Sequence, residues 1–268
     1  MGRIIFVTGT DTGVGKTVLT ASLLHHLRLC GIHALAMKPF CSGSRADVEL
    51  LQSLQDRERS DREINPYYFR EPVAPLVSVK KQRRHISFRE ILRRINLLAG
   101  QCDVLLVEGL GGVMVPLIVG RTLADVIARL NCDVVVVARN QLGTINHSLM
   151  TVKTLRAVGV RVNRIKIVLM NQQDEDVSAR TNRSILSEWL SPVKIFAFPF
   201  FGGNPNKTKA VKLRRKKIKK TLACLTKVAT VAARSLESVK PRRDKETAGT
   251  KTLLTVGAVE TKKLPRIT

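Results

Sequence analysis

The sequence predicts an α/β fold in which one parallel sheet carries helices on both faces. Short runs rich in Val, Ile and Leu alternate with segments whose apolar residues recur at helical spacing, as is typical of βαβ units. The first run enters a glycine-rich turn that opens directly into a helix. The predicted architecture is therefore a single doubly wound domain that binds its ligands at the carboxyl ends of the strands.

Six runs are predicted to be fully buried strands because they are almost continuously apolar. They are residues 4–8, 34–38, 103–107, 133–138, 166–170 and 194–198. Helices are predicted at residues 17–30, 47–55, 88–99, 123–130 and 145–157. Residues 55–70 are charged and irregular, and Pro66, Pro72 and Pro75 indicate an extended crossing loop.

Charge separates a main domain from a C-terminal extension. Residues 207–268 contain 19 Lys and Arg against 4 Asp and Glu, so they carry +15 of the net charge of +25. We expect a domain over residues 1–236 and a basic, disordered tail over residues 237–268, where no core pattern appears. Before the tail, the basic run over residues 212–220, together with apolar residues at helical spacing, predicts a helix docked by its apolar face. Those apolar residues are Ile218, Leu222, Leu225, Val228 and Val231.

Composition excludes several classes of protein. The chain has no apolar run near the ~20 residues that span a bilayer, and its start lacks the pattern of a signal peptide. We therefore expect a cytoplasmic protein without membrane insertion. The five cysteines lack the spacing of a zinc site or a disulfide scaffold. The basic extension is compatible with weak, sequence-independent binding of nucleic acid, but a solvated helix face or a disordered tail explains it equally well.

The turn after the first strand has the features of a phosphate-binding P-loop. Residues 8–17 read Thr-Gly-Thr-Asp-Thr-Gly-Val-Gly-Lys-Thr, with Thr10 where the usual spacing has glycine. Glycines let backbone N–H groups approach phosphate oxygens, Lys16 reaches the terminal phosphates, and Thr17 offers a hydroxyl to Mg²⁺. A purely structural glycine turn is a poor alternative at a junction of strand and helix. The sequence thus predicts nucleotide binding.

This loop variant is similar to that of the dethiobiotin synthetase family. Partitioning and division-site ATPases of the same superfamily carry a second lysine where this chain has Asp11. Further short motifs resemble the family in order and spacing, over residues 4 to about 206. They are Met37-Lys38-Pro39, Ser42-Gly43, Asn65-Pro66-Tyr67, Pro72 with Pro75, Val107-Glu108-Gly109, Gly111-Gly112 and Gly143-Thr144-Ile145-Asn146-His147. The basic C-terminus departs from the family.

The resemblance implies an ATP-dependent ligase of biotin biosynthesis. The family joins 7,8-diaminononanoate, CO₂ and ATP through a carbamate and a carbamic-phosphoric anhydride, and releases dethiobiotin, ADP and phosphate. Such chemistry needs positive charge where two anions approach one another. The resemblance makes Lys38 the catalytic lysine, with Lys16 beside it, although a surface role is the usual alternative for a lysine.

Mg²⁺ prefers oxygen ligands, and the resemblance implies Thr17, Asp47 and Glu108. Glu108 follows an apolar strand, where a carboxylate is costly to bury unless a cation compensates it. Asp47 has a serious alternative as an ordinary acidic residue in the first turn of a helix. Thr12 and Ser42 are suited to hydrogen bonds with carbamate and diamine, respectively, or to capping a turn.

The remaining expected contacts concern ATP and the substrate carboxylate. The loop, a late strand end and the turn after the next strand are expected to bind ATP, through Gly13, Val14, Gly15, Val18, Asn171, Pro199, Phe200 and Phe201. The two phenylalanines can instead be core residues. Gly143 and Asn146 open a helix whose free N–H groups suit the substrate carboxylate. In the family that helix comes from the second subunit, which implies a homodimer.

Two other functions compete with this interpretation. An amidating synthetase that makes cobyrinate diamide needs a glutaminase domain, for which we expect no room. A nucleotide-dependent protein that binds or partitions nucleic acid agrees with the basic tail, but Asp11 and the lack of a recognisable nucleic-acid module argue against it.

Overall fold

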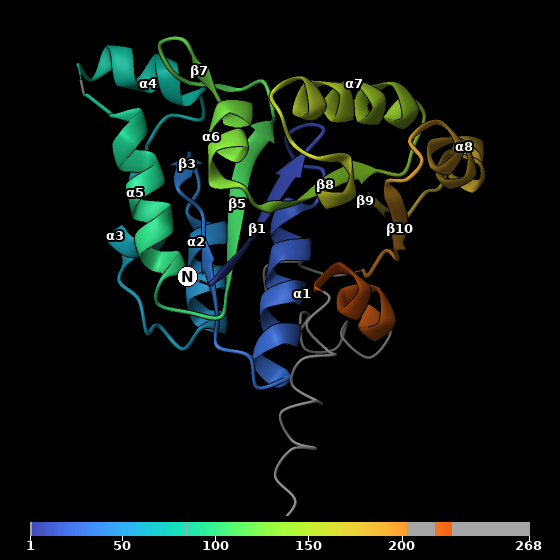
Figure 1. Cartoon of the computed structure of the whole chain (residues 1–268), viewed down its shortest axis with the longest axis horizontal. Helices are drawn as coiled ribbons and strands as arrows, with labels where there is room; N and C mark the ends of the chain where they lie inside the picture. Colours follow the sequence, from blue (N-terminus) through green and yellow to red (C-terminus); the bar gives the residue numbers. More distant parts are fainter. Residues whose placement is uncertain (1, 84, 203–217, 227–268) are drawn as a thin grey trace, which may run out of the picture.

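The computed structural model describes residues 2–83, 85–202 and 218–226. Its centre is a parallel sheet of six strands in the order β10-β9-β8-β1-β5-β2 (Figure 1). All six predicted strands are present. They are β1 (Arg3–Gly9), β2 (Ala34–Met37), β5 (Val104–Gly112), β8 (Asp133–Arg139), β9 (Ile165–Met170) and β10 (Lys194–Phe198).

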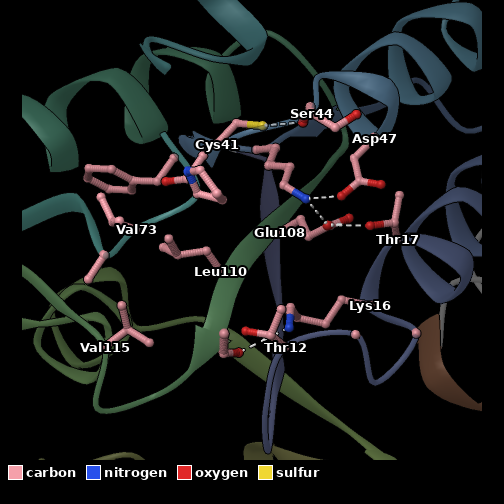
Figure 2. A pocket seen from close by; sticks show the side chains of 18 of the residues that line it. Thr12, Lys16, Thr17, Cys41, Ser44, Asp47, Val73, Glu108, Leu110 and Val115 are labelled. Atoms are coloured by element: carbon pink, nitrogen blue, oxygen red, sulfur yellow. Dashed lines mark hydrogen bonds and ion pairs between the residues drawn. The ribbon is translucent and has the colours of Figure 1, made fainter. Parts of the chain in front are cut away.

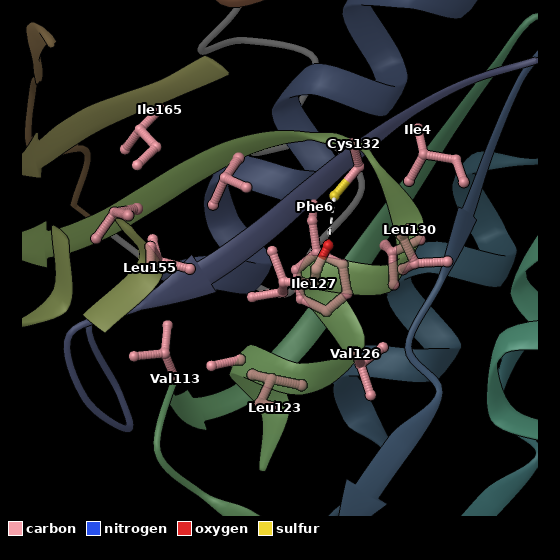
Figure 3. Packing of buried hydrophobic residues seen from close by; sticks show 14 of the residues in the cluster. Ile4, Phe6, Val113, Leu123, Val126, Ile127, Leu130, Cys132, Leu155 and Ile165 are labelled. Carbon is pink, nitrogen blue, oxygen red and sulfur yellow. Dashed lines mark hydrogen bonds between the residues drawn. The ribbon is translucent and has the colours of Figure 1, made fainter. Parts of the chain in front are cut away.

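Successive strand residues point to opposite faces of the sheet, and each face packs on its own set of helices. On one face Ile5 and Val7 lie in a core with α1 (Lys16–Leu29), α2 (Ala46–Leu54) and residues 218–226. On the other face, part of which Figure 3 shows, Ile4 and Phe6 lie in a core with a second set of helices. These are α5 (Phe88–Ala99), α6 (Leu123–Leu130), α7 (Thr144–Ala157) and α8 (Asn182–Trp189). The predicted doubly wound architecture is confirmed, and α8 is a helix that the sequence pattern missed.

The segment that follows α2 contains more regular structure than the expected extended loop. Ser60 and Glu63 form a capping box that starts the short helix α3 (Asp61–Ile64). The strand β4 (Tyr67–Phe69) then pairs in parallel with β3 (Phe40–Ser42). Pro75 opens α4 (Pro75–Lys81), because the fixed φ of proline suits the first position of a helix. The loop prediction was therefore wrong for these residues.

The strand β5 is longer than its apolar run predicts. It continues past Val107 to Gly112, and Val7 of β1 is the partner of Glu108 in register. Glu108 therefore lies inside the sheet rather than in the turn after it. A small hairpin follows, formed by β6 (Pro116–Ile118) and β7 (Arg121–Thr122), and single 3₁₀ turns lie at η1 (Val162–Arg164) and η2 (Val177–Arg180).

Residues 218–226 form a helix that docks on the sheet as predicted. Ile218, Leu222 and Leu225 are buried in the same core as α1. The last carbonyls of the helix accept hydrogen bonds from two strand cations. Lys166 Nζ donates to the carbonyl of Leu225 at 3.1 Å, and the guanidinium of Arg3 donates to that of Thr226. Positive charge at a helix C-terminus is favourable.

The expected apolar residues Val228 and Val231 and the tail over residues 237–268 lie outside the described residues, and so does most of the basic run. Among the residues that are described, no helix has both the length and the apolar character to cross a membrane.

We predict that Leu222→Ala lowers the free energy of unfolding by about 2–5 kcal/mol, because it leaves a cavity between the docked helix and the sheet. Leu222 is fully buried. Chemical denaturation measures the change. Lys220→Ala on the exposed side of the same helix is the matched control and should change stability little. Equal effects of the two substitutions would show that the helix contributes no packing energy.

Candidate functional site

The phosphate loop lies between the end of β1 and the start of α1, in the middle of the sheet. Gly15 has φ = +100° and Gly13 has φ = +71°, a region that side chains other than glycine adopt only with strain. A Cβ atom on Gly13 would also lie 2.9 Å from the guanidinium of Arg139, which donates to the Gly13 carbonyl at 3.2 Å. The loop conformation therefore requires the glycines that the sequence places there.

Lys16 is buried at the base of this loop. Its Nζ donates to the carbonyls of Asp11 at 2.7 Å and Gly111 at 3.1 Å. Burial lowers the pKa of Lys16 to about 8, against the attraction of the Glu108 carboxylate. A glycine loop that opens a helix, with a lysine beside it, suits a polyphosphate, whose negative charge would favour the charged ammonium.

A buried carboxylate in β5 organises the rest of the site (Figure 2). Glu108 is fully buried, and its Oε1 accepts hydrogen bonds from Lys38 Nζ at 2.8 Å and from Thr17 Oγ1 at 2.7 Å. Lys38 Nζ also forms an ion pair with Asp47. Burial opposes the charge of Lys38, but the carboxylates of Glu108 and Asp47 outweigh it and raise the pKa of the lysine. Residues from α1, α2, β5 and the end of β2 thus meet at one point.

The backbone of Lys38 is held from the loop before β4. Its amide donates to the carbonyl of Ile64 at 2.9 Å, and its carbonyl accepts from Asn65 Nδ2 at 2.8 Å. Asn65 is itself buried. The Asn-Pro-Tyr motif at residues 65–67 therefore positions the lysine at the end of β2.

Thr17, Asp47 and Glu108, the three expected ligands of Mg²⁺, are brought together. Glu108 Oε2 is buried and has no hydrogen-bond partner among the described residues, so it has a free acceptor where a cation would lie. The described residues contain no cluster of three or more His, Cys, Asp or Glu that could hold a metal. One hydroxyl and two carboxylates suit Mg²⁺, which keeps several of its waters, rather than a metal that needs a full protein cage.

A cavity of about 520 Å³ opens beside this cluster. Its lining includes the predicted residues Thr12 and Ser42 together with Lys16, Lys38 and the three oxygen ligands. Ser42 Oγ is buried without a partner in the described structure. The other wall comes mainly from loops that only the fold brings here, and apart from the motif residue Pro72 no sequence pattern pointed to it. Its members are Phe40, Cys41, Ser44, Pro72, Val73, Ala74, Leu110 and Val115.

A second pocket of about 180 Å³ lies on the other side of the phosphate loop. Asn171 and Pro199, predicted to contact adenine, line it, and so do Phe200 and Phe201. The loop residues Gly13, Val14 and Gly15 and the helix residue Val18 form the opposite wall. Phe201 also packs edge-on against Phe198, so its alternative as a core residue is partly correct. Gly13, Gly15 and Val18 line both pockets, which therefore adjoin at the loop.

Two predicted residues do not join this arrangement. Gly143 and Asn146, at the start of α7, line neither of these two pockets. Both are exposed, and the N-cap residue Gly143 has φ = +89°.

Known proteins resemble this chain over the region that builds the site. A family model described as an AAA domain matches residues 3–198. An ATP-dependent dethiobiotin synthetase of Bacillus subtilis (strain 168) is 34% identical over 76% of this chain and 87% of its own length. Those of Akkermansia muciniphila and Anaeromyxobacter sp. (strain Fw109-5) are 35% and 40% identical, over 70% and 65% of this chain and 87% and 78% of their own lengths. The chain belongs to the dethiobiotin synthetase family.

Solved structures agree in fold. A ParA protein bound to nonspecific DNA aligns with a TM-score of 0.52 at 14% identity, over 90% of this chain and all of that one. The MinC:MinD cell division complex of Aquifex aeolicus also gives 0.52, at 15% identity, over 92% of this chain and all of the matched one. At such low identity the likeness extends to the P-loop fold alone. The family resemblance expected from the loop and its accompanying motifs is confirmed.

We predict that Lys16 makes the stability of the ligand-free synthetase rise with pH between about pH 8 and 10. The folded protein releases the Lys16 proton near pH 8, whereas the unfolded chain holds it up to the ordinary value of 10.5. The unfolded chain then binds more protons, so the free energy of unfolding increases with pH. Denaturation of wild type and Lys16→Met at several pH values isolates this contribution, with Lys194→Met as an exposed control. A difference that does not vary with pH would contradict the prediction.

We predict that Lys38→Met destabilises the metal-free protein by about 3 kcal/mol, because it leaves Glu108 buried without its cation. Added Mg²⁺ should raise the melting temperature of this variant more than that of wild type, since a second cation replaces the ammonium. Lys81→Met, which breaks the exposed pair with Glu71, is the control and should change stability by less than about 1 kcal/mol. Equal losses in both variants would be inconsistent with this account.

Proposed function

We propose that this synthetase uses ATP to join CO₂ to 7,8-diaminononanoate and to close the ureido ring of dethiobiotin. One observation carries the proposal. Lys16 and Lys38 both line the large cavity, and the loop residues Gly13 and Gly15 line both this cavity and the smaller pocket. A nucleotide with its base in the small pocket and its phosphates on the loop directs its γ-phosphate toward the two lysines.

The proposed reaction has three steps, and none of them forms a covalent bond to the protein. One amine attacks CO₂, loses a proton and becomes a carbamate. A carbamate oxygen then attacks the γ-phosphorus, and the bond to the ADP oxygen breaks. The second amine attacks the carbonyl carbon of the mixed anhydride, loses a proton and expels phosphate. Two anions meet in the middle step, so positioned cations supply most of the catalysis.

Lys38 is the proposed catalytic lysine, because its ammonium is charged, preorganised and directed at the cavity. Thr17, Asp47 and Glu108 are the residues that would hold Mg²⁺. When bound, the metal neutralises charge on the β- and γ-phosphates. The ammonium of Lys38, now held by Glu108 and Asp47, would then be free to contact the carbamate.

The large cavity suits an elongated diamine. Thr12 and Ser42 offer hydroxyls on its wall, and the unpartnered Ser42 Oγ is available to an amine. Phe40, Leu110 and Val115 line the same cavity and provide an apolar wall for the alkyl chain. A lining that combines hydroxyl groups with apolar side chains agrees with the chemistry of diaminononanoate.

A homodimer is proposed to complete this site. Gly143 and Asn146 sit exposed at the start of α7, away from the cavity of their own chain. Exposed apolar side chains flank them, with Leu142 81% and Met150 52% accessible. Free N–H groups at this helix start suit the carboxylate of a diamine bound in a second subunit. Weak nucleic-acid binding by the basic tail and a cytoplasmic location stay predictions.

We predict that the purified protein hydrolyses ATP only when diaminononanoate and CO₂ are both present, because the phosphoryl acceptor is a carbamate made from the two. Phosphate release and dethiobiotin formation should rise together.

We predict that Lys38→Ala retains ATP binding, which Lys16 and the loop provide, and that its turnover rate falls by a factor on the order of 10²–10³. ATP hydrolysis at equal rates with and without the diamine would exclude the synthetase function, and normal turnover by Lys38→Ala would make that lysine structural.

A further inference from the structure

Three asparagine side chains connect the small pocket to the interior beneath α8. Asn171 lines the pocket, whereas Asn140, after β8, and Asn182, at the start of α8, are 5% and 1% exposed. Asn140 Nδ2 donates to Asn171 Oδ1 at 3.1 Å. Asn182 Nδ2 donates to Asn140 Oδ1 at 3.0 Å. None of the family motifs in the sequence includes Asn140 or Asn182.

Backbone carbonyls determine how each amide in this chain of asparagines is oriented. Asn140 Nδ2 also donates to the carbonyl of Ala179 at 3.1 Å, and a carbonyl can only accept. Asn182 Nδ2 likewise donates to the carbonyl of Gln141 at 3.3 Å. Both hydrogens of Asn140 Nδ2 therefore have acceptors, and its oxygen has a donor. Reversing either amide would bring two acceptors together in a buried site, at a cost that favours the observed orientation.

The orientation of the Asn140 side-chain amide determines the orientation of the Asn171 side-chain amide. Because Asn140 presents a donor, Asn171 must present its oxygen, so its Nδ2 is directed elsewhere. Within the described residues Asn171 Nδ2 donates to no other group, while its backbone amide donates to the carbonyl of Phe198 at 2.9 Å. The side chain thus offers the pocket two N–H donors and the second lone pair of Oδ1.

We propose that Asn140 and Asn182 are positioning residues that lock Asn171 for a 6-aminopurine and against a 6-oxopurine. An asparagine amide pairs with the N6 and N7 edge of adenine, since N6–H donates to Oδ1 and N7 accepts from Nδ2. Guanine has an acceptor, O6, in place of the amino group. An amide that cannot reverse meets O6 with its own oxygen, so the buried network disfavours guanine as well as favouring adenine.

This inference depends on the proposed use of the small pocket for the base, so its test measures nucleotide binding and not synthesis. Titration calorimetry compares ADP with GDP on the full-length protein. Wild type should bind ADP more tightly. Asn140→Ala should lower the ratio of ADP to GDP affinity by about 10-fold, and Asn182→Ala should lower it by less, because the carbonyl of Ala179 still orients the Asn140 amide. Leu186→Ala is the matched control, because it removes a fully buried side chain of α8 that lies outside the network. It should lower the melting temperature and leave the ratio unchanged.

Two asparagine variants are used so that the test does not depend on the folding of either one. Asn182→Ala leaves Asn140 in place and serves if Asn140→Ala does not fold. A ratio that stays at the wild-type value in a folded asparagine variant, or that falls as much in Leu186→Ala, would overturn the inference. So would a wild-type protein that binds ADP and GDP equally. A protein that makes no dethiobiotin but shows the expected ratios would refute the proposed reaction and leave the base selectivity intact.

Discussion

The charge of Glu108 is the constraint around which the site is built. A carboxylate inside a parallel sheet, buried on every side, is stable only when cations and donors compensate it. Lys38 and Thr17 fill that need, and Asp47 joins through the lysine. Each partner comes from a different element, so β5, the end of β2, α1 and α2 must all be in place before the charge is compensated. Folding and assembly of the reactive groups are therefore one event.

The phosphate loop shows the complementary case, in which positive charge is held in an unfavourable place. Among the described residues, the buried Lys16 ammonium has two carbonyls as direct hydrogen-bond partners, and burial lowers its pKa. Lys38, close by, has two carboxylates and a raised pKa. The same residue type thus takes two roles in one cavity. Under the proposed function, one lysine would gain from an incoming phosphate, and the other would stay neutralised until a metal competed for its carboxylates.

Sheet topology explains why the two pockets adjoin. The strand β1 lies between β5 and β8. The connection from β1 runs past β5 to β2, whereas the connection from β5 runs back past β1 to β8. A crevice forms at such a switch point, outside the carboxyl ends of the strands. The carboxylate cluster borders one side of the loop, and the asparagine network supports the other. Under the proposed function, a nucleotide that lies across the loop would connect a side that selects the base with a side that transfers phosphate.

Local sequence was sufficient for the strands, for most helices and for the phosphate loop. Buried strands must be apolar on both faces, and a tight phosphate loop needs glycine at positions such as Gly13 and Gly15. The family motifs contain Lys38 and Glu108, and the resemblance implied Asp47 as a further site residue; the structure then established that the three lie together. Only the tertiary structure revealed that Glu108 lies inside β5 and that Asn140 and Asn182 support Asn171. Those features depend on contacts between residues far apart in the chain. The pattern within one segment does not specify which distant residues that segment will contact.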